Sequence, residues 1–250
     1  GISAVASMLA GVVVGMLVRN VPSNSKAKKD IEETRPIDTV TTNEDQEDEI
    51  LLSCPLGTSL WAGVATVFAV SFLFNVGDST FHAFFPALLK QNSLSASNIG
   101  LTYTSLAAIS FAVSATLGAT TMQRLGSVTR CAAGLTAVGT GLLVMGLWST
   151  HLLPVVLAAA LYYSGVPFYS PSIPTMLLQC VPPNRRGFIL GLDGIINTIG
   201  RILAPLVIGS LYQLYGAKAA FGVAGGAALL AAILAFVKRI IVLRHNKNQT

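Results

Sequence analysis

Long apolar runs separated by short polar segments constrain this chain more than any other feature of its sequence. The chain contains seven such stretches, at residues 2–18, 60–89, 98–121, 128–150, 152–178, 188–214 and 217–237. A helix needs about 20 apolar residues to cross the hydrocarbon core of a bilayer, and the last six stretches reach that length. Runs such as 60–74 and 227–237 lack the alternation of β-barrel strands. The pattern predicts an all-α, polytopic transmembrane helical bundle.

The composition supports this prediction. Hydrophobic residues make up 52% of the chain and charged residues only 11%, whereas soluble domains carry about 25% charged residues. Nine of the eleven acidic residues lie between Asp30 and Glu49, so the apolar stretches are nearly free of negative charge. The net charge of +5 therefore belongs to the loops. We expect the lipid bilayer as a partner, and no nucleic acid.

Polar segments divide the chain into four predicted parts. Residues 1–18 are interpreted as the end of a membrane helix, 19–58 as an acidic linker, 59–237 as a six-helix bundle and 238–250 as a basic tail. The first stretch is marginal in length and lacks the pattern of a signal peptide. The simplest interpretation is a fragment whose partner is the missing N-terminal helices of the same protein; a complete chain is the alternative.

Lysine and arginine residues gather on one side of the predicted membrane. The linker, the loops after the third and fifth stretches and the tail hold 13 of the 16 Lys and Arg residues. The opposite side holds only Lys90 and Lys218, and Arg201 lies within a stretch. Because cytosolic loops carry an excess of Lys and Arg, the linker and the C-terminus are predicted to be cytosolic. The identity of the membrane is left open.

Three sequence motifs resemble the major facilitator superfamily. Residues 119–128 resemble the loop G-x-x-x-D-[KR]-x-G-[RK]-[RK], in which Arg124 and Gly126 match and the Asp position holds Gln123. Residues 182–194 and 201–212 resemble the eleventh helix of drug:proton antiporters of the tetracycline-efflux type. Residues 81–86 also fit the end of a seventh helix.

The resemblance implies the C-terminal half of a transporter: the end of helix six, a central linker and helices seven to twelve. It implies secondary transport of a small organic solute by alternating access, with proton-coupled export as the favoured mode. A proton-independent or importing carrier on the same fold is the first alternative. A transport-inactive scaffold or receptor, working through its acidic linker, is an alternative of another class.

Four ionisable residues other than Tyr and Cys lie within the stretches: Asp78, His82, Asp193 and Arg201. A charge at the centre of a membrane helix costs about 2.5–3.5 kcal/mol, so such residues usually face a cavity or a partner. Asn75, Asp78 and His82 share one helical face. We predict substrate binding by Asn75 and Asp78, and proton coupling by Asp78 and His82. Alternatively, the helix ends near Gly77 and both titratable groups lie at the water interface.

Asp193, Asn197 and Arg201 are spaced by four residues and form a second polar stripe. Asn197 and Arg201 are predicted to bind substrate, with a structural clamp as the alternative for Arg201. A direct pair between Asp193 and Arg201 is not expected because they lie two turns apart. Asp193 is instead assigned to a cytosolic gate, whose other predicted members are Arg124, Gly126, Arg185 and Arg186.

Four prolines, at positions 154, 167, 171 and 174, interrupt the fifth stretch. Prolines leave backbone carbonyls free and bend a spanning helix. Tyr162 and Tyr163 lie beside these breaks and are predicted to line a substrate cavity, with ordinary packing as the alternative. The sequence holds no GxxxxGK[ST], CxxC or HExxH pattern. We therefore expect no ATP, metal or other cofactor. We also expect no enzymatic activity, because no Ser-His or paired-Asp constellation with credible spacing occurs.

Overall fold

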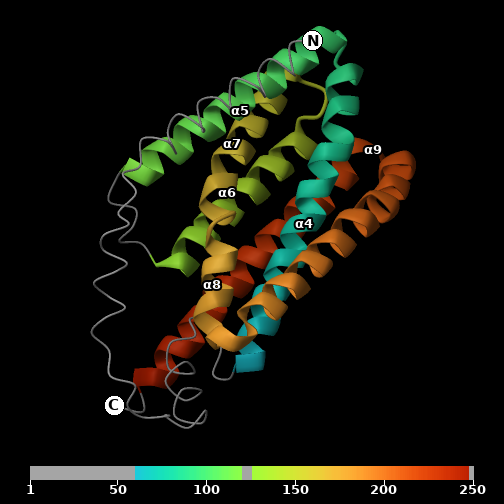
Figure 1. Ribbon diagram of the computed structural model, residues 1–250. Helices are drawn as coiled ribbons and strands as arrows, with labels where there is room; N and C mark the ends of the chain where they lie inside the picture. Colours follow the sequence, from blue (N-terminus) through green and yellow to red (C-terminus); the bar gives the residue numbers. More distant parts are fainter. Residues whose placement is uncertain (1–59, 120–125, 248–250) are drawn as a thin grey trace, which may run out of the picture. The chain divides into compact units, whose positions relative to one another are not determined.

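The computed structural model describes residues 60–119 and 126–247, and every regular element within them is helical (Figure 1). The elements are α4 (Leu60–Gln91), α5 (Ala96–Ala119), α6 (Ser127–Leu147), α7 (Leu152–Tyr169), α8 (Ser172–Cys180), the 3-10 turn η2 (Pro183–Arg185) and α9 (Arg186–Lys247). The predicted all-α membrane bundle is confirmed. The predicted segments 1–18 and 19–58 lie outside the described residues.

Five helical segments of the described chain are long and apolar enough to cross a membrane. They are Trp61–Gln91, Ala96–Thr116, Ser127–Leu147, Leu152–Cys180 and Pro183–Ile241. The last has 59 residues, which as one straight helix would reach about 90 Å, three times the hydrocarbon core. Gly216, with φ 77° and ψ −174°, breaks it into two. The two parts correspond to the predicted stretches 188–214 and 217–237.

Proline affects two helices differently. α4 continues through Pro86 to Gln91, so the alternative in which this helix ends near Gly77 is wrong. The proline-rich fifth stretch, by contrast, is divided into α7 and α8, with Pro171 as the N-cap of α8. Pro174 lies in the first turn of α8, where the N–H that proline lacks would have had no helical partner.

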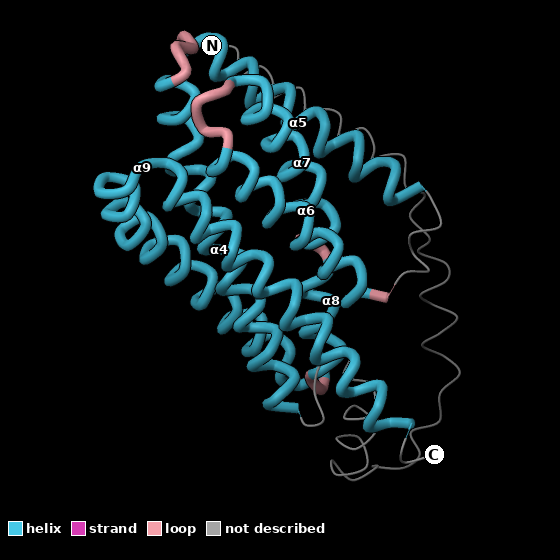
Figure 2. Tube along the Cα trace, turned by 180° about the vertical axis from the view of Figure 1, so that it is seen from behind, coloured by secondary structure: helices cyan, strands magenta, loops and turns pink. Residues whose placement is uncertain are grey.

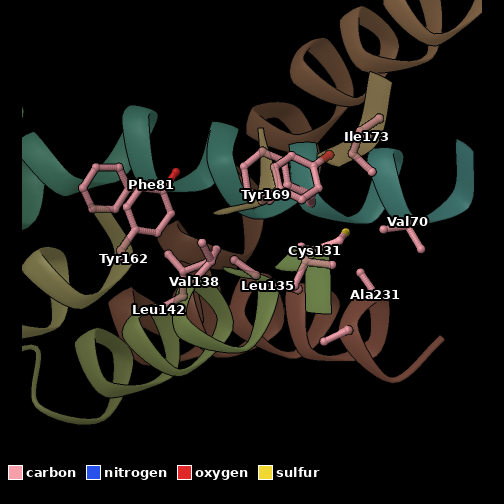
Figure 3. Packing of buried hydrophobic residues seen from close by; sticks show 14 of the residues in the cluster. Val70, Phe81, Cys131, Leu135, Val138, Leu142, Tyr162, Tyr169, Ile173 and Ala231 are labelled. Carbon is pink, nitrogen blue, oxygen red and sulfur yellow. The ribbon is translucent and has the colours of Figure 1, made fainter. Parts of the chain in front are cut away.

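The core lies between α4, α6, α7, α8 and both parts of α9, helices whose arrangement can be followed in Figure 2. Phe81 of α4 stacks on Tyr162 of α7, with ring centroids 4.1 Å apart. Figure 3 shows this pair beside the aliphatic side chains of α6. The first part of α9 packs on α4, where the Phe84 and Tyr212 rings stack at 4.9 Å. α5 is peripheral, and only 6% of its apolar window is buried.

The turns between helices gather at two ends of the bundle. At one end, Asn92 Nδ2 donates a hydrogen bond to the Ser149 carbonyl at 3.0 Å, joining the turn after α4 to the turn after α6. These turns and the Gly216 break line a common cavity of about 430 Å³. At the other end, Ser127 Oγ at the start of α6 donates to Gln179 Oε1 of α8 at 3.2 Å. The helices therefore run up and down between the two ends.

Candidate functional site

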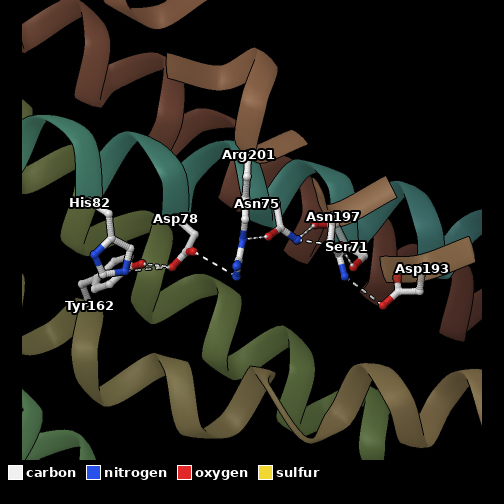
Figure 4. Close-up of polar contacts among 8 residues, drawn as sticks. All are labelled: Ser71, Asn75, Asp78, His82, Tyr162, Asp193, Asn197 and Arg201. Atoms are coloured by element: carbon white, nitrogen blue, oxygen red, sulfur yellow. Dashed lines mark hydrogen bonds and ion pairs between the residues drawn. The ribbon is translucent and has the colours of Figure 1, made fainter. Parts of the chain in front are cut away.

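Eight polar side chains form a continuous row across the middle of the bundle (Figure 4). This polar chain consists of Ser71, Asn75, Asp78 and His82 from α4, Tyr162 from α7, and Asp193, Asn197 and Arg201 from α9. On α4 the spacings are four, three and four residues, and on α9 they are four and four. Such spacings keep side chains on one helical face. The site arises because α4 and α9 turn these two faces toward each other.

Asp78 organises one end of the polar chain. The Tyr162 hydroxyl donates to its Oδ1 at 2.6 Å, and His82 Nε2 lies 3.6 Å from the same oxygen. Arg201 Nη2 lies 3.6 Å from Oδ2. The carboxylate thus has neighbours on α4, α7 and α9, and its side chain is only 14% exposed. The arrangement places two groups that can exchange protons, a carboxyl and an imidazole, beside a fixed positive charge.

Two asparagines form the centre of the polar chain. Asn75 accepts a hydrogen bond from Arg201 Nε at 3.0 Å on its oxygen, and its Nδ2 donates to Asn197 Oδ1 at 2.7 Å. Asn197 Oδ1 also accepts from Ser71 Oγ at 2.7 Å. The spatial order therefore differs from the sequence order, because Asn75 connects the two residues of α9. Amide groups suit this role since each carries donors and an acceptor.

Asp193 ends the polar chain on the side of α8. Its Oδ2 accepts from Asn197 Nδ2 at 2.9 Å. Its Oδ1 is buried and has no hydrogen-bond partner among the described residues. Asp193 and Arg201 form no direct pair there, as expected from their spacing; each contacts an asparagine instead.

Two cavities open along the polar chain. One, of about 240 Å³, is lined by residues of α4 and α9, among them Asn75, Asp78, Asp193, Asn197 and Arg201, and by residues of α7 and α8. The second, of about 400 Å³, is lined by Asp78, Ser79, His82, Ala83, Arg201 and Pro205. Volumes of this order are typical of small-molecule sites. Asp78 and Arg201 line both cavities, so the ion pair stands between them.

Seven residues predicted for substrate binding, proton coupling or gating meet in the polar chain: Asn75, Asp78, His82, Tyr162, Asp193, Asn197 and Arg201. Neither Tyr162 nor Tyr163 lines either cavity. Tyr162 is buried, and the half-buried ring of Tyr163 stands edge-on to Phe81 at 5.6 Å. The roles assigned to these residues remain predictions.

The remaining gate residues lie away from the polar chain. Arg124 falls outside the described residues. Gly126 precedes α6, where a Cβ would stand 3.0 Å from Arg239 Nη1. Arg185 and Arg186 are exposed, and Arg186 Nε donates to the Val181 carbonyl at 3.4 Å. Within the described chain neither arginine forms an ion pair with Asp193. The gate likewise remains a prediction.

Ser71 and Ser79 were missed by sequence reasoning. Ser71 lies four residues before Asn75, so the same helical spacing could have added it to the face. Ser79 is buried and lines the larger cavity, but a serine in an apolar helix carries no signal that separates it from packing. Across the described residues, no group of three or more His, Cys, Asp and Glu side chains could hold a metal ion.

The sequence is similar to one family of known proteins. The model of one family, described as Major Facilitator Superfamily, matches residues 67–250. A search of the curated proteins found no match. The family match covers every residue of the polar chain. It identifies the superfamily and does not assign the chain to the drug:proton antiporter subgroup.

Proposed function

Because the chain belongs to the major facilitator superfamily of membrane transporters, we propose that it carries a small organic solute across the bilayer by alternating access. We further propose export of this solute coupled to protons. The chain is an integral membrane protein. Alternating access requires a central site that faces each side of the membrane in turn.

The polar chain is the single observation that carries the proposal. Uncompensated charge within a membrane helix is costly, so ionisable residues there usually mark substrate or ion pathways. Asp78, His82 and Arg201 lie together across α4 and α9, and two cavities open beside them. A structural clamp alone would not need cavities on both sides of the ion pair.

We further propose roles for residues of the polar chain and for residues outside it. Asp78 and His82 take up and release the coupling proton. Asn75, Asp78, Tyr162, Tyr163, Asn197 and Arg201 contact the solute, the four residues other than the tyrosines from the cavities that they line. Arg124, Gly126, Asp193, Arg185 and Arg186 form a gate on the cytosolic side, and the N-terminal helices of the same protein complete the central cavity.

The test is solute flux by the complete protein in liposomes with an imposed pH difference. Asp78→Asn keeps the shape of the side chain but removes the titratable group. We expect the proton-dependent flux to fall by about tenfold or more, which corresponds to an activation barrier higher by about 1.4 kcal/mol or more. His82→Asn should weaken the pH dependence, whereas His151→Asn, at the N-cap of α7 and outside both cavities, should leave it unchanged.

Flux with an unaltered pH dependence in Asp78→Asn would remove Asp78 from the coupling mechanism. Flux that never responds to pH in the unaltered protein would favour the proton-independent carrier. A protein that moves no solute at all would favour the scaffold, and deletion of residues 26–49 should then abolish its function.

A further inference from the structure

The larger cavity beside the polar chain offers hydrogen-bond donors that no protein group uses. It lies between α4 and the first part of α9, and its volume is about 400 Å³. We propose that this cavity binds the carboxylate of an organic anion, held by the guanidinium of Arg201 and the hydroxyl of Ser79. This inference rests on the proposed function and names the chemical class of its solute.

Arg201 is held in place but not saturated. Its Nε donates to Asn75 and its Nη2 lies near Asp78, whereas Nη1 has no hydrogen bond or ion pair with any described residue. The side chain is 63% exposed, and Figure 4 shows it reaching across α4. A guanidinium presents donors in a planar fork that matches a carboxylate. Contacts on one edge therefore preorganise Arg201 and leave the other edge for a ligand.

Ser79 gives the cavity a second unused donor. It is only 8% exposed, and its Oγ has no hydrogen-bond partner among the described residues. The neighbouring Thr80 instead donates to the carbonyl four residues earlier, at 2.7 Å, which is the usual solution for a hydroxyl within a helix. A buried hydroxyl without a partner is destabilising. An acceptor oxygen in the cavity would satisfy it.

The exposed guanidinium favours an anion over a cation. The Arg201 side chain is 63% exposed, whereas the Asp78 side chain is 14% exposed. Asp78 is also already occupied by Tyr162 and Arg201. An ammonium group entering this cavity would meet the guanidinium first and would have to displace existing donors to reach Asp78. A carboxylate would meet unused donors.

The smaller cavity contains another acceptor for an amine. Asp193 lines the smaller cavity, and its buried Oδ1 has no hydrogen-bond partner among the described residues. Binding there would prefer cations and would not depend on Ser79, which lies in the larger cavity. A comparison of probes with opposite charge therefore separates the two cavities.

The experiment measures equilibrium binding of three tritiated probes to the complete purified protein in lipid nanodiscs. The probes are 1-naphthoate, the neutral 1-naphthamide and the cationic 1-naphthylmethylammonium, which share one ring system. We expect saturable naphthoate binding, with the affinity for naphthamide lower by about tenfold or more. Arg201→Gln should reduce the affinity for naphthoate to that for naphthamide, and Ser79→Ala should reduce it about threefold to tenfold.

Two further variants keep the result interpretable. Arg201→Lys retains the charge but loses the planar fork, so it should lower naphthoate affinity by several-fold with the bundle still folded. Lys218→Gln removes a basic residue of the same helix outside this cavity, and it should leave naphthoate affinity unchanged. Thermal unfolding of each variant reports whether it is folded.

Naphthoate affinity that is unchanged in folded Arg201→Gln would overturn the inference. A preference for the ammonium probe, or no saturable binding of any probe, would also overturn it. The proposed transport function is judged separately, by flux: a protein that exchanges a neutral or cationic solute for protons retains that function without this anion site.

Discussion

Tyr162 combines packing and polar contact in one side chain. Its ring is buried against Phe81 at a centroid distance of 4.1 Å, and its hydroxyl donates to Asp78 Oδ1 at 2.6 Å. A largely buried carboxylate that loses one of its donors has less compensation for its desolvation. The ring and the hydroxyl can be separated by substitution, because Phe keeps the former and removes the latter.

Tyr162→Phe is expected to lower the free energy of unfolding by about 1–3 kcal/mol through the lost hydrogen bond to a charged group. Tyr162→Ala should cost about 3–5 kcal/mol, because the ring stacking is lost as well. Unfolding of the purified protein by denaturant measures both. Tyr163→Phe is the matched control: the Tyr163 hydroxyl has no hydrogen bond within the described residues, so this change should be nearly neutral. Equal effects of the two Phe variants would contradict the role given to the Tyr162 hydroxyl.

At the residue scale, helical spacing predicted which polar side chains share a face, and the structure places Asn75, Asp78 and His82 along one row. The sequence could not show that Asn75 contacts both Asn197 and Arg201, because contacts between helices depend on how far each helix is rotated and shifted against its neighbour. Ser79 shows the same limit, since its unused hydroxyl is a property of the cavity rather than of the spacing.

At the element scale, glycines set how closely α6 approaches its neighbours. A Cβ on Gly134 would stand 2.7 Å from the Gly165 carbonyl oxygen, and one on Gly141 would stand 2.7 Å from the Ala158 carbonyl oxygen. Both obstacles are backbone atoms of α7, which cannot rotate away. In membranes, where lipid is as apolar as a leucine side chain, such close backbone packing is a main source of helix association.

Gly134→Ala is therefore expected to separate α6 from α7 and to destabilise the bundle by about 1–3 kcal/mol. Gly222→Ala, on the second part of α9, is the matched control, since no atom lies within 4 Å of its added Cβ. This control should be neutral or stabilising by up to about 1 kcal/mol, because Ala favours a helix more than Gly does. Unfolding curves in one detergent compare the two; an equal loss in both would contradict the close-packing argument.

The helical stretches were predictable because their length and apolar content are set by the bilayer. The six stretches from residue 60 onward all correspond to described helices. The break in the fifth stretch follows from its prolines, whereas the persistence of α4 past Gly77 and through Pro86 does not. Gly77 lies in a packed contact, where a Cβ would meet Leu142 at 3.1 Å, so neighbouring helices support the backbone there.

At the scale of the whole molecule, the two ends of the bundle differ in charge. The end formed by the Gly216 break and the turns after α4 and α6 carries Lys90 and Lys218. The opposite end carries Arg130, Arg185, Arg186, Lys238 and Arg239. Because basic residues are retained on the cytosolic side during insertion, this asymmetry predicts one orientation for the bundle. It also requires that α9 cross the membrane twice.

Epitope tags inserted in the complete protein test this orientation in intact cells that carry the protein in their plasma membrane. Tags after Ser93, Ser149 and Gly216 should be reached by antibody without permeabilisation, whereas tags after Asn184 and at the C-terminus should require it. The comparison of Asn184 with the C-terminus is the sharpest, because the two positions flank α9. They lie on the same side only if Gly216 turns the chain back across the bilayer. Staining of Asn184 and the C-terminus from opposite sides would contradict the double crossing. Staining of every tag from the reversed side would instead leave the bundle intact and overturn only the orientation inferred from charge.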